Sequence, residues 1–331
     1  MNDSTLIKYR SAQEVGSTLG QVLQEQGKLT EPQVERVLQQ QRETLDRFGE
    51  VAVKLGYVSQ GEVDVALAVQ FSYPHVPVEK GGLSPLLIAV HQPRSAEVEA
   101  LRGLRSQILL GWMGKGKQIL TVAGYDDTTS APLLAANLAV VMSQLGERTL
   151  LIDANIRSAP LGPLFGLETV IGLSEILSSR AGLESIIPVE TLRELSLMTA
   201  GALPSNPQEL VSRSTFPLLL DKLRHQYQVI VINTPPFSLV ADAQLVAARG
   251  DGVLLCAEAG RTTIDHLERM QQSLQRTGSE LLGCVLNHPE SIMKRANTGP
   301  LKWATQKWTS LMAMKSGGRK SEAESAGVVR A

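Results

Sequence analysis

The stretch AGYDDTTSAPLLAANLAVVMSQLGERTLLIDANIR, residues 123–157, decides the fold of this chain. An apolar strand ends in a short polar loop, a helical pattern follows, and a second apolar run ends on an aspartate. Continuous apolar strands that alternate with helices indicate a doubly wound, mostly parallel α/β sheet with helices on both faces. The expected strands are QILTVAG (118–124), RTLLIDA (148–154), LSLMTAG (195–201), QVIVINT (228–234), GVLLCAE (252–258) and LLGCVLN (281–287).

The composition is that of an ordinary globular protein. The 331 residues carry a formal charge of -1, which excludes a global field that would attract nucleic acid. Both cysteines, Cys256 and Cys284, fall inside predicted strands, with no spacing that suggests a metal site. The first residues lack the apolar core of a signal peptide, and no apolar run is long enough to span a membrane. We therefore expect a cytoplasmic protein, with the inner-membrane surface as a candidate peripheral location.

The frame of residues 123–157 is that of a P-loop nucleotide site, but the loop lacks the usual chemistry. In a P-loop, glycine amides surround phosphate, a lysine reaches the outer phosphates and a hydroxyl holds magnesium. Counting back from AANLA (135–139), the lysine position is Ala131 and the hydroxyl position is Pro132. Asp126 and Asp127 place negative charge where an anion would approach. We interpret the loop as an ordinary helix start, with Ser130 as the cap.

Two other metal-binding positions have changed as well. The strand ends that offer carboxylates to magnesium in P-loop enzymes carry Asp153 with Asn155, and then Asn233. Asp153 is expected to cap a loop, and Arg157 to pair with Asp153 or Asp126. These nucleotide-site remnants predict no ATP-dependent phosphoryl transfer, no ATP–magnesium cofactor and no other metal.

The α/β part resembles the bacterial tyrosine kinases of polysaccharide export (BY-kinases), in the MinD/ParA-like branch of P-loop proteins, and in particular the EpsG-type chain-length determinant. The resemblance rests on the ordered segments EVEALRGLR (97–105), AANLA, GERTLLIDA, GALPSNPQEL (201–210), TPPFSLVADAQ (234–244) and DGVLLC (251–256). It implies a kinase-like domain at 95–290. Implied partners are a second copy, an active BY-kinase or a membrane chain-length determinant (polysaccharide co-polymerase).

One helix of this domain matches a family pattern for assembly. Glu99, Arg102 and Arg105 fit the ExxRxxR pattern, which the resemblance ties to ring-like self-association, and a solvated helix face is the alternative. BY-kinases usually end in clustered tyrosines, whereas the last tyrosine here is Tyr227. We therefore interpret the chain as a pseudokinase that regulates exopolysaccharide synthesis or export. An active tyrosine autokinase with an unorthodox site, a MinD/ParA-like positioning protein and a docking scaffold are the alternatives.

The N-terminal part contains a repeat. Residues 18–41 align with residues 47–70 at an offset of 29, and each copy predicts a short helix, a glycine stop and a longer helix. Thr30 and Ser59 are the expected caps of the longer helices, each with a Gln or Glu three residues on. We expect a small all-α domain of two similar halves at 1–72, followed by an irregular linker at 73–94.

This repeat is similar to the tandem motif of MshE-type N-terminal domains, related to type II secretion ATPases, which implies cyclic di-GMP binding. Copy one departs at Thr18, where the motif has arginine. A protein-docking module without ligand is the alternative interpretation. The candidate ligand residues are Leu19, Gly20, Leu23, Gly27, Leu38, Gln41, Arg47, Gly49, Gly56, Leu67 and Gln70.

The tail at 291–331 carries eight basic residues against two acidic ones. Its segment LKWATQKWTSLMAMK (301–315) has the pattern of a basic amphipathic helix. Such a helix suits an anionic membrane surface or a membrane partner. The alternative is that its tryptophans fold back onto the sheet domain.

Overall fold

The computed structural model describes residues 18–44, 46–70, 82–167, 171–239 and 241–288. The chain divides into two compact units, with the division between residues 77 and 78. Within the described part, no helix is both long and apolar enough to cross a bilayer. The predicted amphipathic segment 301–315 lies outside the described residues.

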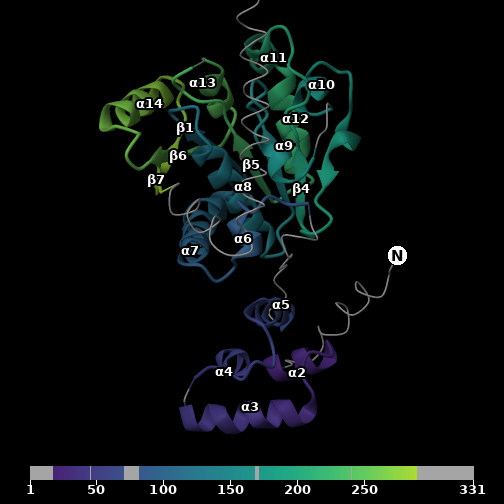
Figure 1. Cartoon of the computed structure of the whole chain (residues 1–331). Coiled ribbons are helices and arrows are strands. Elements are labelled where there is room, and N and C mark those ends of the chain that lie inside the picture. The colour runs from purple at the N-terminus through teal and green to yellow at the C-terminus, as the bar shows by residue number, and fades with distance from the viewer. Residues whose placement is uncertain (1–17, 45, 71–81, 168–170, 240, 289–331) are drawn as a thin grey trace, which may run out of the picture. The chain divides into compact units, whose positions relative to one another are not determined.

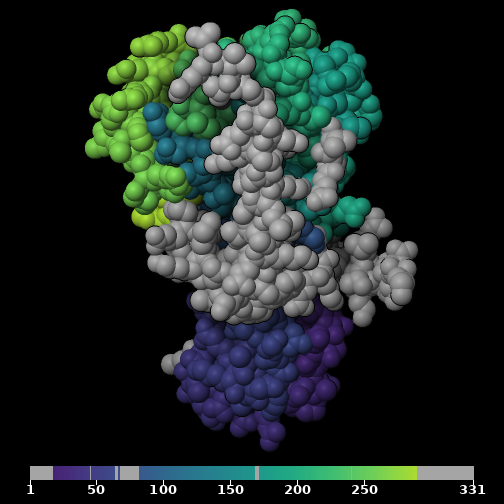
Figure 2. Space-filling view, turned by 45° about the horizontal axis from the view of Figure 1, so that its top comes forward, coloured from purple at the N-terminus to yellow at the C-terminus, as the bar shows by residue number. Residues whose placement is uncertain are grey.

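The described part of the N-terminal unit, residues 18–44 and 46–70, forms four helices. Its surface is the purple and dark-blue one in Figure 2. Two short helices alternate with two longer ones, as the repeat predicts. Gly27 and Gly56 follow the short helices in the left-handed region, with φ of 67° and 72°, which confirms the two glycine stops. Backbone amides of Thr30 and Ser59 donate to the side chains of Gln33 and Glu62, as expected for capping boxes. The helices are α2 (Leu19–Glu25), α3 (Glu31–Thr44), α4 (Phe48–Lys54) and α5 (Gln60–Gln70).

The two halves interlock through equivalent glycines. A Cβ on Gly20 of α2 would meet Phe48 at 3.2 Å and Val34 at 3.3 Å. A Cβ on Gly49 of α4 would meet Val63 at 2.7 Å and Leu19 at 3.5 Å. Phe48 is the repeat equivalent of Leu19, and Val63 is that of Val34. The two halves therefore make equivalent contacts and are related by a pseudo-two-fold axis. The core between them contains Val22, Leu23, Leu29, Val37, Val51, Ala52, Val58, Val63 and Ala66.

The second unit is built on a seven-stranded sheet (Figure 1), with the strand order β3-β4-β2-β5-β1-β6-β7. All six predicted strands are present and mutually parallel. The sequence analysis missed a seventh, the two-residue strand β3, which pairs antiparallel with β4 at the edge. The strands are β1 (Ile119–Gly124), β2 (Thr149–Asp153), β3 (Ile187–Pro188), β4 (Leu195–Met198), β5 (Val229–Asn233), β6 (Gly252–Glu258) and β7 (Leu281–Asn287).

Helices cover both faces of this sheet. On one face α8 packs against β1, β2, β5 and β6, and α6 and α7 pack against α8. Every residue of α8 is buried, which explains its uninterrupted apolar sequence. The helices, including the two 3-10 turns, are α6 (Ile88–His91), α7 (Ala96–Gly111), η1 (Met113–Lys115), α8 (Ser130–Ser143), α9 (Leu161–Leu164), α10 (Leu173–Leu177), η2 (Leu183–Ser185), α11 (Pro207–Ser212), α12 (Thr215–Arg224), α13 (Asp242–Ala247) and α14 (Ile264–Arg276).

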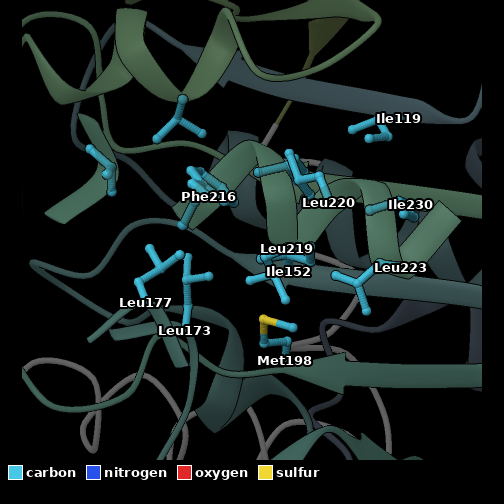
Figure 3. Close-up of a cluster of buried hydrophobic side chains, with 14 of the residues drawn as sticks. Ile119, Ile152, Leu173, Leu177, Met198, Phe216, Leu219, Leu220, Leu223 and Ile230 are labelled. Carbon is cyan, nitrogen blue, oxygen red and sulfur yellow. The ribbon is translucent and has the colours of Figure 1, made fainter. Parts of the chain in front are cut away.

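A large apolar core lies between the sheet and α12. Figure 3 shows Leu219, Leu220 and Leu223 of this helix beside Ile152 of β2 and Ile230 of β5. Since successive strand residues point to opposite faces, the strand residues next to each of these isoleucines face α8. A smaller cluster joins β1 and β6 to α13 and α14. Both faces of the sheet are therefore covered by apolar packing, and the polar site lies at the carboxyl edge of the strands.

The predicted linker differs from the structure at its C-terminal end. Residues 83–91 are buried throughout and belong to the second unit, whereas residues 73–94 were expected to form an irregular linker. Asn137 of α8 binds both the Ala89 amide (3.0 Å) and the Leu86 carbonyl (3.1 Å). The reason is the apolar run LLIAV (86–90), which outweighs the neighbouring proline and glycines because it gains burial under α8.

Candidate nucleotide site

The loop after β1 does not form an anion cradle. Helix α8 begins at Ser130, so Ser130 is its first residue and the prediction that it caps the helix is wrong. Its hydroxyl instead donates to Glu258 Oε2 at 2.6 Å, and its amide donates to Thr128 Oγ1 at 3.4 Å. A carboxylate from the end of β6 thus lies against the start of the helix. That arrangement is unfavourable for phosphate in the same place.

The residues at the positions predicted for the lysine and the hydroxyl pack as apolar residues. Ala131 and Pro132 are both buried in the first turn of α8. The Cβ of Ala131 lies 2.9 Å from the point where Gly124 would carry a Cβ. The end of β1 and the start of α8 are therefore in van der Waals contact through a methyl group. A methyl group and a proline ring supply neither positive charge nor a magnesium ligand.

The strand-end remnants form a buried hydrogen-bonded cluster. Asp153 is fully buried, and its carboxylate accepts from the Leu161 amide (2.9 Å), the Asn155 amide (3.2 Å) and Asn233 Nδ2 (3.1 Å). The prediction that it caps a loop is confirmed by these contacts. Burial raises the pKa of Asp153 to about 7, although the hydrogen bonds from Leu161, Asn233 and Asn155 act to lower it. A carboxylate engaged in this way holds the ends of β2 and β5 together.

Arg157 has a different partner from the two proposed for it. Its Nε and Nη2 lie 2.9 Å and 2.8 Å from Asp242 Oδ2, in the first turn of α13. The predicted pairing with Asp153 or Asp126 is therefore wrong. The reason is position, because Asp153 is enclosed by backbone amides while Asp242 faces the loop after β2. An ion pair within the protein thus adjoins the strand ends.

Three residues of this site were missed in the sequence analysis: Glu258, Asp242 and His266. The ring of His266, from α14, stacks on Tyr125 with centroids 3.9 Å apart and planes 10° apart. Asp242 lies in the segment TPPFSLVADAQ (234–244), whose resemblance to BY-kinases implied no role for the aspartate. Glu258 and His266 gave no local signal, because their contacts span more than a hundred residues.

Comparison with known proteins decides the family of this unit. Tyrosine-protein kinase YwqD of Bacillus subtilis is 30% identical over 201 residues, which cover 61% of this chain and 85% of that protein. The chain belongs to the bacterial tyrosine kinases. EpsB of Ralstonia solanacearum is 31% identical over 201 residues, and there the chain spans only 27% of the relative's length.

The same relationship holds for a solved BY-kinase structure. The kinase domain of the Escherichia coli tyrosine kinase ETK superposes with a TM-score of 0.59 at 28% identity, covering 65% of this chain and 81% of that domain. No protein-family model matches the chain. The BY-kinase fold is therefore shown, and the resemblance of the N-terminal repeat to MshE-type domains stays an expectation.

The BY-kinase assembly pattern lies on α7. Arg102 forms an ion pair with Glu99, and Arg105 Nη1 donates to the Val141 carbonyl of α8 at 2.6 Å. Arg105 therefore ties α7 to α8 within the unit. Self-association through this helix stays a prediction.

The candidate cyclic di-GMP residues separate into two groups. Gly20, Leu23 and Gly49 are buried, and Leu19 and Leu67 pack against the core, so the fold alone accounts for them. Gly27 and Gly56 serve as helix stops. Packing does not account for Arg47, which is exposed, Leu38, which is 42% exposed, or Gln41, which is half-buried. The side chain of Gln70 lies outside the described residues.

Proposed function

We propose that this chain is a non-catalytic BY-kinase that regulates the synthesis or export of an exopolysaccharide. The observation that carries the proposal is the packing of Ala131 and Pro132 where the family places its lysine and hydroxyl. Ser130 with Glu258, and Arg157 with Asp242, then occupy the neighbouring positions with protein–protein contacts. Phosphoryl transfer depends almost entirely on such positioned positive charges, so their loss removes the reaction.

The kept scaffold would act through protein partners. The partners of this proposal are a second copy, an active BY-kinase or a membrane chain-length determinant. Occupancy of the N-terminal domain would change how the scaffold packs with them. The ligand of that domain in this proposal is cyclic di-GMP, with Arg47 giving a charge-assisted contact to phosphate. Copy one carries Thr18 at the equivalent position, so a single guanidinium would be available.

The experiment is calorimetric titration of the full chain with ATP–magnesium and, separately, with cyclic di-GMP. We expect no heat with ATP–magnesium and no phosphotyrosine on the protein. We expect heat with cyclic di-GMP that disappears in Arg47→Ala and persists in Arg36→Ala, an exposed arginine of α3 outside the candidate set.

The two ligands separate the two parts of the proposal. ATP binding or phosphotyrosine would contradict the pseudokinase and favour an active autokinase. The absence of heat with cyclic di-GMP would contradict the proposal that the N-terminal domain is a sensor and would favour a docking module. Equal heats in Arg47→Ala and Arg36→Ala would place the ligand elsewhere and overturn the assignment of Arg47.

A further inference from the structure

The second unit has an apolar groove that none of the strand-end residues Asp153, Asn155 and Asn233 lines. It has a volume of about 240 Å³ and lies between α7, α8 and the end of β7. This volume is smaller than the roughly 300–1,000 Å³ of typical small-molecule sites, so the groove suits inserted side chains. Its walls include Leu101 and Leu104 of α7, Leu133 and Leu134 of α8, and Val285 and Leu286 of β7.

One wall of the groove belongs to an edge strand. β7 is the last strand in the sheet order, and its residue Leu286 is 60% exposed. An edge strand that carries exposed leucine invites association, and natural proteins commonly cover such edges. The groove and this leucine together form one continuous apolar surface.

The rest of the chain begins at this surface. Asn287 and His288 both line the groove, and His288 is the last residue of the described range. Residues 289–300 can span at most roughly 40 Å when fully extended. The segment 301–315 is therefore tethered within reach of the groove, at a high effective concentration.

The chemistry of that segment matches the groove. Leu301, Ala304, Trp308, Leu311 and Met312 follow helical spacing on one side, and the lysines Lys302 and Lys307 lie off it. Aromatic side chains such as tryptophan gain most from filling an apolar groove. Glu97 of α7 also lines the groove.

We propose that residues 301–315 of this chain dock as an amphipathic helix into the groove between α7 and β7. Docking covers Leu286 and the edge of the sheet, and it turns the lysine face of the segment outward. The segment then packs on the second unit of its own chain, in preference to a membrane or a partner protein. This inference stands whether or not the nucleotide site is active.

The test uses tryptophan fluorescence of the full chain. The three tryptophans are Trp112, which is 6% exposed and gives a constant background, and Trp303 and Trp308 of the segment. Leu286→Asp should raise acrylamide quenching of the emission several-fold. Leu218→Asp on α12 is the matched control, because Leu218 is 59% exposed and lies outside the groove. Leu311→Asp should raise quenching as Leu286→Asp does, and the double variant should show no further rise.

Three results would overturn the proposal. Equal quenching in the wild type and Leu286→Asp would show that the groove does not hold the tail. A difference that disappears on dilution would assign the groove to the tail of a second copy. Quenching in buffer could also be the same in the variants and the wild type. If the wild-type emission then changes only when phosphatidylglycerol vesicles are added, the segment binds the membrane surface instead of the groove. Circular dichroism spectra that match across the variants establish that each is folded.

Discussion

At the scale of single residues, Asp153 has a structural role at the end of β2. Its carboxylate is fully buried and accepts two backbone amides and the Asn233 amide. Two neighbouring carboxylates would repel each other here, so asparagine at 233 removes a cost that bound magnesium would otherwise offset. The Oδ1 of Asn233 has no hydrogen-bond partner among the described residues. With its amide reversed, Asn233 accepts a hydrogen bond through this oxygen from the protonated Asp153 carboxyl group.

This burial predicts a pH dependence of stability. The pKa of Asp153 is raised from 3.8 to about 7, so the folded state holds a proton that the unfolded state has released. The free energy of unfolding should fall as pH rises from about 4 to about 7, by up to about 4 kcal/mol. Asp153→Asn should flatten this fall, because a reversed Asn233 amide can accept from the new side chain. Urea unfolding of both proteins at about pH 5 and about pH 8 measures it.

The control for this prediction is Asp265→Asn, because Asp265 is an exposed carboxylate of α14. That variant should keep the wild-type slope. A slope in Asp153→Asn equal to that of the wild type would show that another group causes the pH dependence.

At the scale of elements, the repeat is a packing device whose two glycines differ in tightness. Gly49→Ala should destabilise the N-terminal unit by about 1–3 kcal/mol, because its methyl group would lie 2.7 Å from Val63. Gly20→Ala should cost less, because its nearest contacts are at 3.2 Å and 3.3 Å. Urea unfolding followed by circular dichroism gives both values.

Gly61→Ala is the control of opposite sign. Gly61 is exposed in α5, and a Cβ there would meet only Ser59 Oγ, at 4.0 Å, so alanine should stabilise the helix by about 0.5 kcal/mol. Equal losses for Gly49 and Gly20, or a loss at Gly61, would contradict the packing derived for the repeat.

The same scale shows what the sequence could predict. Periodicity identified six strands, the helix at 95–113 and all four helices of the repeat, because each signal lies within one element. Partners were harder, since Arg157 pairs with Asp242 and Asn233 with Asp153 across 85 and 80 residues. Only the folded sheet brings such residues together. The buried run 83–91 was missed for a related reason, because its partner, α8, lies some fifty residues later in the chain.

At the scale of the whole molecule, the chain combines a repeat with its own core and a BY-kinase unit in which Glu258 contacts Ser130 at the start of α8. If this combination is a regulator, its output should depend on the N-terminal unit and on the ligand proposed for it. In cells that carry the wild-type chain, exopolysaccharide yield and chain length should change when cyclic di-GMP is raised. A chain that lacks residues 1–72 should give no such response.

Two point variants make this last prediction specific to ligand binding. Arg47→Ala should abolish the response as the deletion does, because it removes the guanidinium proposed to contact phosphate while leaving the buried core of the repeat intact. Arg36→Ala should keep the response. Size-exclusion analysis of the purified glycan at low and high cyclic di-GMP measures all four strains. A full response in the deletion strain would show that the second unit acts without its N-terminal partner, and the pairing of sensor and scaffold would have to be abandoned.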